Sequence, residues 1–315
     1  MTLIIIDGKN ALYRFGHAMK NLITENNTPT GAVYGFIGMM LRLKKKYQDG
    51  QFVIVWDGIG YRAGWRSKLY SEYKSNRAVT GLSADVKAIH SQEAVIKKIC
   101  NLLGLVQTAL DEVEADDIIG VLATQLKEYY ETVVVYSTDK DFLQLMKNGV
   151  TVIRDVGKQR MTPMTPVDVG ELFRCEIKDV LKIRAICGDG SDNIKGAMKG
   201  VGGVGAMKMI AAGADPGDPF CKVGHSRWGS EVWERVHTNY RIMRIIQSPD
   251  DKELSRSQQV QLEREVTRIE AHLFGKVKLK RTTDDFRALL ALLSELELRD
   301  AIENRHELWA LSKIN

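Results

Sequence analysis

Acidic residues directly follow three short apolar runs in this sequence. Asp7 follows LIII, Asp57 follows FVIVW, and Asp139 and Asp141 follow TVVVYST. Each run has the length and composition of a buried strand. Because ligands of open parallel sheets bind at the carboxyl ends of the strands, a sheet of these strands gathers the acids at one edge. Carboxylates so close together raise one another's pKa, and a bound divalent cation relieves their repulsion.

Two further acidic groups stand at a predicted helix start and in a predicted loop. The first, EADD, contains Glu114, Asp116 and Asp117, and the second, GDGSDN, contains Asp189 and Asp192. Each acidic group alone has an ordinary explanation, because acids stabilise a helix dipole, Asp-Gly is a common turn, and STDKD fits a helix cap. Five acidic groups together favour a shared site over five separate caps.

The donors in these groups indicate a metal and its chemistry. They are carboxylates with no accompanying cluster of histidine or cysteine, which argues against zinc. Carboxylates and water suit Mg²⁺, for which Mn²⁺ can substitute. Two such ions about 3.5–4 Å apart favour in-line phosphoryl transfer, because one activates the attacking water and the other stabilises the leaving oxygen.

The segment 61–77 combines cations with aromatic rings. Its basic residues are Arg62, Arg66, Lys68, Lys74 and Arg77, and its aromatic residues are Tyr61, Trp65, Tyr70 and Tyr73. Cations bind phosphates and aromatic faces stack on bases, so the segment suits single-stranded nucleic acid. The alternative is a solvated basic loop whose aromatic side chains hold it to the rest of the protein.

A glycine-rich segment offers a second place for a phosphate. GVGGVG contains Gly200, Gly202, Gly203 and Gly205, and its backbone N–H groups can approach a phosphate closely. Three basic residues flank it: Lys195, Lys199 and Lys208. The alternative is a plain corner between two helices, where glycine only permits the turn.

The elements that must position these residues form two regions. Residues 1–164 alternate strands with helices, which predicts an α/β fold with a mostly parallel sheet and helices on both faces. Apolar residues at helical spacing predict helices over 30–46, 84–103 and 114–129. Residues 58–83 break the pattern and are expected to form an exposed, arch-like excursion.

Residues 165–315 are predicted to be helical and to pack on the first region. Helices are expected over 180–187, 231–247, 253–274 and within 284–313, and residues 213–230 read as a loop. The glycine-rich segment lies between two of these helices.

Composition narrows the class of protein. The 315 residues are 44% hydrophobic and 27% charged, with a net charge of +5, as in an ordinary globular protein whose surface away from the acids is basic. The four cysteines show no CxxC pair, so we expect reduced thiols and a cytoplasmic protein. No apolar run approaches the roughly 18 residues of a membrane span.

Six motifs together resemble the flap-endonuclease/5′-nuclease family. They are IIIDGKNALYR, VIVWDG, EYKSNR, VEADDIIG, YSTDKDFLQL and GDGSDNIKG, in the order of the family. This family includes the N-terminal 5′-nuclease domain of bacterial DNA polymerase I and the stand-alone phage 5′–3′ exonucleases. The resemblance implies the PIN-like α/β fold of the family, with a helix–three-turn–helix region at the glycine-rich segment.

The resemblance also implies roles for the acids and cations. Asp7, Asp57, Glu114 and Asp116 would hold a first Mg²⁺, and Asp116, Asp139, Asp141 and Asp189 a second, with Asp117 and Asp192 in support. The residues Lys74, Arg77 and Arg14 would contact the scissile phosphate, with Tyr73 as a stacking surface and Arg62 and Arg66 binding DNA. The glycine-rich loop would grip duplex DNA, with a bound K⁺, although its glycines allow two registers.

The resulting expectation is a Mg²⁺-dependent, structure-selective 5′ nuclease. It would cut DNA near a junction of single strand and duplex, as a stand-alone monomer in replication or repair, with an RNA–DNA primer hybrid as a further substrate. Its setting would be a bacterial or phage-infected cell. Two alternatives stay open: a PIN-type ribonuclease, against which the glycine loop argues, and a non-catalytic DNA-junction-binding protein, against which the full set of acids argues.

Overall fold

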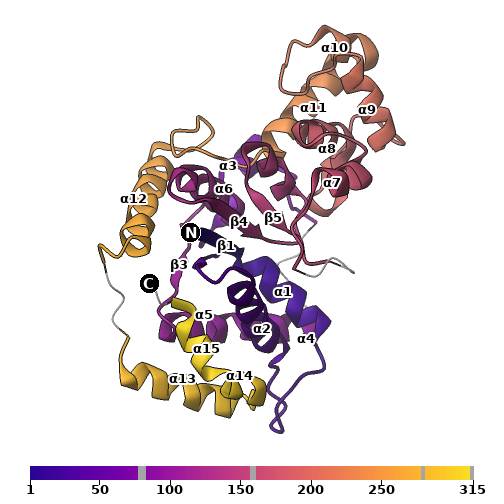
Figure 1. Cartoon of the computed structure of the whole chain (residues 1–315). Helices are drawn as coiled ribbons and strands as arrows, with labels where there is room; N and C mark the ends of the chain where they lie inside the picture. Colours follow the sequence, from indigo (N-terminus) through magenta and orange to yellow (C-terminus); the bar gives the residue numbers. More distant parts are fainter. Residues whose placement is uncertain (77–82, 157–160, 278–280, 313–315) are drawn as a thin grey trace.

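The computed structural model describes residues 1–76, 83–156, 161–277 and 281–312. Its centre is a five-stranded sheet in which all pairings are parallel, in the order β3-β2-β1-β4-β5 (Figure 1). The strands are β1 (Thr2–Asp7), β2 (Gln51–Val55), β3 (Val106–Thr108), β4 (Thr132–Tyr136) and β5 (Thr151–Ile153). The predicted α/β fold with a parallel sheet is confirmed.

The strands read as continuous apolar runs because both faces of the sheet are covered. In β1, Leu3 and Ile5 point to one face while Ile4 and Ile6 point to the other, and all four side chains are fully buried. Since β1 lies between β2 and β4, its end and theirs meet at one edge of the sheet.

One face of the sheet is covered by helices from both ends of the chain. These are α1 (Gly8–Ala18), α2 (Gly31–Lys46), α4 (Ala84–Ser91), α5 (Glu93–Leu102), α13 (Thr283–Glu295), α14 (Arg299–Glu303), α15 (Arg305–Trp309) and the short η6 (Ala310–Ser312). The helix predicted over 30–46 is confirmed as α2. The one predicted over 84–103 is two helices, because the chain turns at Gln92, whose side chain accepts hydrogen bonds from the first N–H groups of α2.

The other face carries α6 (Ala115–Gln125), η2 (Lys127–Tyr129), η3 (Asp141–Asn148) and α12 (Arg256–Leu273). Beyond it, the upper lobe of Figure 1 contains α7 (Pro166–Phe173), η4 (Ile177–Asp179), α8 (Val180–Cys187), α9 (Gly203–Ala211), α10 (Lys222–Trp228) and α11 (Ser230–Met243). Between α8 and α9 lie β6 (Gly188–Asp189), η5 (Gly190–Asp192) and β7 (Ile194–Lys195). Reading 213–230 as a loop was wrong for α10, which packs on α11 around Gly224 and Trp233.

The hydrophobic core on this face runs without a break from the sheet into the upper lobe. In contrast, α12 packs against α6, α13 against α5, and α14 and α15 against α2, so the last helices wrap around the first region. A boundary at 164/165 stays a prediction. Within the described part of the chain, every helix is too short or too polar to cross a bilayer.

Candidate active site

Six of the nine predicted acids border a cavity at the carboxyl edge of the sheet. The cavity has a volume of about 490 Å³. Its acidic lining residues are Asp7, Asp57, Glu114, Asp116, Asp139 and Asp192, and its other lining residues are Lys9, Asn10, Tyr13, Tyr61, Arg62, Lys74, Val86 and Ala115. The parallel strand ends therefore do bring acids from distant parts of the sequence to one place.

The carboxylate of Asp7 is fixed where β1 passes into α1. Its Oδ1 accepts a hydrogen bond from the N–H of Asn10 (3.0 Å), and its Oδ2 accepts one from the hydroxyl of Ser137 (2.9 Å). The side-chain oxygen of Asn10 in turn accepts hydrogen bonds from the N–H and hydroxyl of Thr138, both at 2.9 Å. This network locks the β1–α1 turn to the loop after β4, which carries Asp139.

The start of α6 brings a second set of acids to the same cavity. Asp57, just past β2, accepts a hydrogen bond from the N–H of Ala115 (3.0 Å), and so holds the first turn of α6 against β2. This contact aims Asp116 toward Asp7 and Asp139, whose charges act on it.

Burial and mutual repulsion raise the pKa values of these crowded carboxylates. Burial raises the pKa of Asp7 to about 7, and the charges of Asp57 and Asp139 add to the rise. Burial raises the pKa of Asp116 well above its ordinary value, with further contributions from Asp139 and Asp7. Such mutual repulsion is what a divalent cation would remove.

The pKa of Glu114 is lowered and not raised, because cations surround this carboxylate. Lys74 donates to its Oε2 at 2.5 Å, the Tyr73 hydroxyl donates to the same oxygen at 3.2 Å, and Nη1 of Arg66 lies 3.7 Å from Oε1. Burial favours the neutral form of Glu114, but Arg66 and Lys74 outweigh it and hold its pKa below the ordinary value.

The remaining predicted acids form a second group beside η5. Arg184 of α8 makes ion pairs with Asp141 and with Asp189, the latter at 2.7 Å from Nη2 to Oδ2. Asp189 also accepts hydrogen bonds from the N–H and hydroxyl of Ser191, at 2.8 and 2.6 Å. Asp192 faces the main cavity, whereas Asp141 and Asp189 are absent from its lining.

The chemistry of the donors fits a hard divalent cation, because the cavity gathers carboxylate oxygens whose repulsion is not compensated. Among the described residues, however, no three acids converge closely enough to form a finished metal cage. Lys74 and Arg184 explain part of this, since their ammonium and guanidinium groups take up the oxygens of Glu114, Asp141 and Asp189.

Two predicted site residues have another role in this structure. Asp117 is fully buried, and Nη1 and Nη2 of Arg66 donate to its two oxygens at 2.6 and 2.8 Å. Trp65 Nε1 and the N–H of Ile246 also donate to Asp117, both at 3.0 Å. The supporting role predicted for Asp117 at the metal and the DNA contact predicted for Arg66 do not fit this structure. The two side chains are buried and paired with each other, so neither is open to a metal ion or to DNA.

Three further predicted residues also lie differently than expected. Arg14 is tied to the buried Asp155, at 2.9 Å from Nη2 to Oδ2, and is absent from the cavity lining, so its predicted phosphate contact is not available in this structure. The ring of Tyr73 is buried and lies under the Lys74 ammonium at 4.7 Å, so it is not an open stacking surface. Arg77 lies outside the described residues.

Of the excursion predicted over 58–83, residues 58–76, which the structure describes, are only partly exposed. It contains the short η1 (Tyr61–Ala63) and α3 (Trp65–Leu69), and Trp65 is buried against α6. The exposed Arg62 and the partly buried Tyr61 line the cavity, so the basic segment does border the acids.

The glycine-rich segment adopts one of the two registers. Gly200 has a φ of +87°, which favours glycine, and α9 begins at Gly203, so residues 200–202 form the turn. Added Cβ atoms at Gly200 or Gly202 would meet no atom within 4 Å, so the turn presents its backbone openly. The three flanking lysines are exposed, and Lys195 pairs with Glu72 at 3.3 Å.

Sequence reasoning missed several residues that line or brace the site. Lys9, Asn10 and Tyr13 follow Asp7 within one motif, and a helix period would have placed Lys9 and Tyr13 on one face of α1. Arg184 gave no signal, since a lone arginine in an amphipathic helix reads as a solvent-exposed residue.

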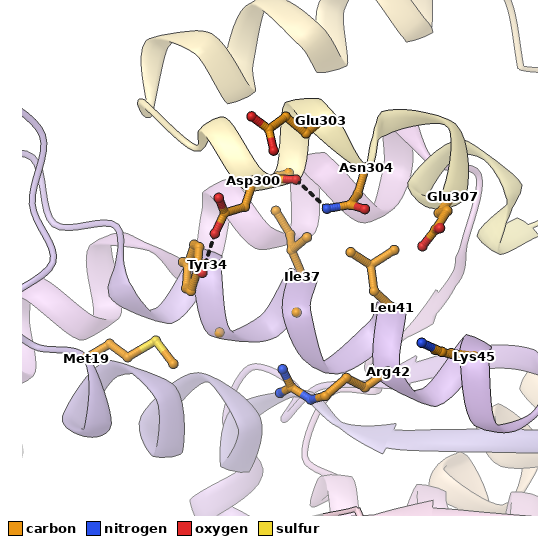
Figure 2. A pocket seen from close by; sticks show the side chains of 13 residues that line it. Met19, Tyr34, Ile37, Leu41, Arg42, Lys45, Asp300, Glu303, Asn304 and Glu307 are labelled. Atoms are coloured by element: carbon orange, nitrogen blue, oxygen red, sulfur yellow. Dashed lines mark hydrogen bonds between the residues drawn. The ribbon is translucent and has the colours of Figure 1, made fainter.

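A second hollow, of about 360 Å³, lies between α2 and the pair α14–α15, away from the acids. Figure 2 shows Arg42 and Lys45 on the α2 side and Glu303 and Glu307 on the other. Asp300 accepts a hydrogen bond from the Tyr34 hydroxyl at 2.7 Å. The opposite charges of the two walls favour the docking of the last helices on α2.

Comparisons with known proteins show which family this chain resembles. The family model described as "5'-3' exonuclease, N-terminal resolvase-like domain" matches residues 2–174. A 5'-3' exonuclease of Aquifex aeolicus is 34% identical over 209 residues, covering 66% of this chain and 68% of that protein. DNA polymerase I of Pseudomonas aeruginosa is 35% identical over 211 residues, and the match spans 66% of this chain but only 22% of the polymerase.

Solved structures show the same fold. The bacteriophage T5 D15 flap endonuclease, in a complex with DNA and metal ions, has a TM-score of 0.63 at 18% identity, covering 86% of this chain and 100% of that one. Flap endonuclease-1 from Methanococcus jannaschii has a TM-score of 0.56 at 16% identity, covering 98% and 92%. With the family model matched over more than half of its length, this chain belongs to the 5′–3′ exonuclease family.

Proposed function

We propose that this protein is a divalent-metal-dependent, structure-selective 5′ nuclease that hydrolyses phosphodiesters in DNA. The observation that carries the proposal is the cavity in which Asp7, Asp57, Asp116 and Asp139 converge from three strand ends and one helix start. Lys74 and Arg62 border the same cavity, so a phosphate can lie next to both acids and cations. Membership of the 5′–3′ exonuclease family supports this assignment.

The acids would hold Mg²⁺, with Mn²⁺ as a substitute. Asp7, Asp116 and Asp139 are the core of the first position, with Asp57 and Glu114 beside them, and Asp141, Asp189 and Asp192 belong to a second. Bound there, the cations would supply a more acidic water and neutralise charge on the reacting phosphate. The T5 flap endonuclease was solved in a complex with metal ions, which supports a metal cofactor for this chain as well.

The chain's own cations complete the site. The Lys74 ammonium forms an ion pair with Glu114 and lies 6.0 Å from the centre of the Tyr61 ring. Both residues line the cavity together with Arg62. From there Lys74 can donate to a non-bridging phosphate oxygen without leaving the cavity. Its backbone is also fixed, since the N–H of Lys74 donates to the carbonyl of Asp192 at 2.9 Å.

We expect Lys74→Ala to slow cleavage about 10- to 100-fold, because a hydrogen bond to a charged group contributes roughly 1.5–3 kcal/mol. DNA binding should weaken far less, since Lys74 is one of many cations. The matched control is Lys68→Ala, an exposed lysine of the same segment, which should change binding and cleavage to the same small extent. Single-turnover rates and equilibrium binding on one substrate separate the two effects. Equal losses of rate and affinity in Lys74→Ala would show that it only holds the strand.

The upper lobe would grip duplex DNA. The open turn at 200–202 and the first N–H groups of α9 can reach a phosphate, and a K⁺ bound at this turn would strengthen the contact. Lys195, Lys199 and Lys208 add charge on the same side of the chain. The expected substrates are DNA with a 5′ flap or 5′ end and an RNA–DNA primer hybrid, processed by a monomer during replication or repair.

The decisive experiment measures cleavage of a labelled 5′-flap duplex with Mg²⁺, with EDTA, and with the Asp116→Asn variant. Metal-dependent cutting at the junction that the variant loses supports the nuclease. Cutting of single-stranded RNA alone would favour a PIN-type ribonuclease, and tight junction binding without any cutting would favour a binding protein.

The protonation of the acids gives a second test in metal-free protein. Raised pKa values at Asp7 and Asp141, both to about 7, mean that the folded state binds more protons than the unfolded state between about pH 4 and 7. Stability should therefore fall as pH rises through this window, and the raised pKa values of Asp57 and Asp116 act in the same direction. The lowered pKa values of Glu114 and Asp189 act only below this range, and the lowered pKa of the partly buried His90 acts in the opposite direction.

We expect the melting temperature in EDTA to fall by several degrees from pH 5.5 to 8, at roughly 2–4 °C per kcal/mol. In Asp7→Asn this fall should be smaller, and the difference between the two proteins cancels the contribution of His90. Identical pH profiles for wild type and Asp7→Asn would contradict the crowding of the acids.

A further inference from the structure

We propose that Arg184 is a built-in counter-ion for the second group of acids, and that a divalent cation must displace its guanidinium to bind there. This inference rests on the proposed function and adds to it the order in which the two positions fill. It follows from the contacts of Arg184, its burial, and the difference between the two acidic groups.

Arg184 lies in the last turn of α8, and its side chain is 11% exposed. Its guanidinium touches Asp141 from one side and donates to Asp189 at 2.7 Å on the other. It thus bridges the residue that opens η3 and the residue that precedes η5. These are the carboxylates that a cation at the second position would coordinate.

The fit of Arg184 to this place is incomplete. Oδ1 of Asp141 and Nε of Arg184 are both buried, and neither makes a hydrogen bond within the described residues, although the two groups form an ion pair. A divalent ion can coordinate Oδ1 of Asp141 directly. The guanidinium of Arg184 contacts this oxygen only as an ion pair, without a hydrogen bond.

In the first group, Lys9 and Lys74 line the cavity, but among the described residues neither forms a salt bridge with Asp7, Asp57 or Asp116 as Arg184 does with Asp141 and Asp189. Among the described contacts of Asp7 are hydrogen bonds from Asn10 and Ser137, which are neutral donors. Lys74 makes its ion pair with Glu114 and not with Asp116. A cation therefore gains more at the first position, where charge is uncompensated, than at the second, where it must compete.

The consequence is sequential filling. One divalent ion binds tightly to the group around Asp116, and the next binds weakly until the Arg184 guanidinium swings away. Competition of this kind is reciprocal: removing the guanidinium strengthens the second ion by the same factor by which the ion weakens the guanidinium contact.

The test is a Mn²⁺ titration of metal-free protein followed by electron paramagnetic resonance, which counts free and bound ions without any reference to cleavage. Wild type should bind one ion tightly and one weakly. In Arg184→Gln the weak affinity should rise about tenfold or more, within the roughly 5- to 150-fold range of such couplings. Arg184→Lys, which keeps the charge but not the two-sided contact, should lie between the two.

The matched control is Arg241→Gln, which removes an arginine in the last turn of α11 that donates two 2.9 Å hydrogen bonds to Glu253, and it should leave both Mn²⁺ affinities unchanged. An unchanged or lost second ion in Arg184→Gln, with Arg184→Lys like wild type, would overturn the inference. Failure of the proposed function would give a different result in the same titration. Wild type would then bind no Mn²⁺ tightly, or Asp116→Asn would bind the tight Mn²⁺ as wild type does.

Discussion

Replacing Asp116 by Asn should reduce cleavage of a flap substrate by about 10³-fold or more, while leaving the protein folded and able to bind DNA. Asp116 lines the same cavity as Asp7 and Asp139, whose charges act on it, and in the proposed site it would be a ligand of the first cation. A bound metal ion stabilises the transition state by several kcal/mol, and a loss of about 4 kcal/mol corresponds to a roughly 10³-fold slower reaction.

The same substitution should stabilise the metal-free protein. Burial, Asp139 and Asp7 raise the pKa of Asp116, which means that its ionised form is disfavoured in the folded state. Asn keeps the shape and removes the charge, so the melting temperature in EDTA at pH 8 should rise. A variant that loses activity because it unfolds would show the opposite shift, and a variant with full activity would contradict the metal assignment.

The adjacent carboxylate provides the sharpest control. Asp117 stands next to Asp116 in the sequence, but successive residues of a helix point about 100° apart, so the two side chains leave α6 in different directions. Asp117→Asn should therefore lower stability through the buried Arg66 contact, whereas Asp116→Asn should lower turnover without that loss.

Asp116 and Asp117 also show how much of the site the sequence alone could predict. The strands and the acids that follow them were predictable because an apolar run and the residue at its end are local features, and a parallel sheet then places all such ends at one edge. The motif with three acids correctly marked the start of α6. Which of its carboxylates faces the cavity depends on the partners of each, and those lie far away in the chain.

The role of Arg66 was mispredicted for the same reason: its partners lie far away in the chain. Arg66 donates to the carbonyls of Ile242 and Arg244, and Asp117 accepts from the N–H of Ile246, about 130 residues beyond α6. No spacing rule connects such positions, so Arg66 looked like one more charge in a basic segment. Arg62, four residues earlier, does border the cavity, and only the burial of α3 against α6 and α11 separates the two.

Removing the Arg66 guanidinium should be the most destabilising single change among the charged residues discussed here. Arg66 is 4% exposed, and its four hydrogen bonds and one longer ion pair join α3 to the start of α6, to the end of α11 and to the segment that follows α11. Arg66→Met would leave the fully buried Asp117 carboxylate without its cation. Breaking one partner of a buried ion pair costs about 3–5 kcal/mol, so urea denaturation should show a loss of that size.

A double variant separates the unpaired charge from the loss of packing. If the cost of Arg66→Met comes from the stranded Asp117 carboxylate, Arg66→Met with Asp117→Leu should be more stable than Arg66→Met alone. The control Arg241→Gln breaks a more exposed pair and should cost about 1 kcal/mol or less. A double variant as unstable as the sum of the two single ones would mean that the carboxylate is not the cause. The segment after α11 would then depend on Arg66 chiefly through its hydrogen bonds to the two carbonyls, which both variants lack.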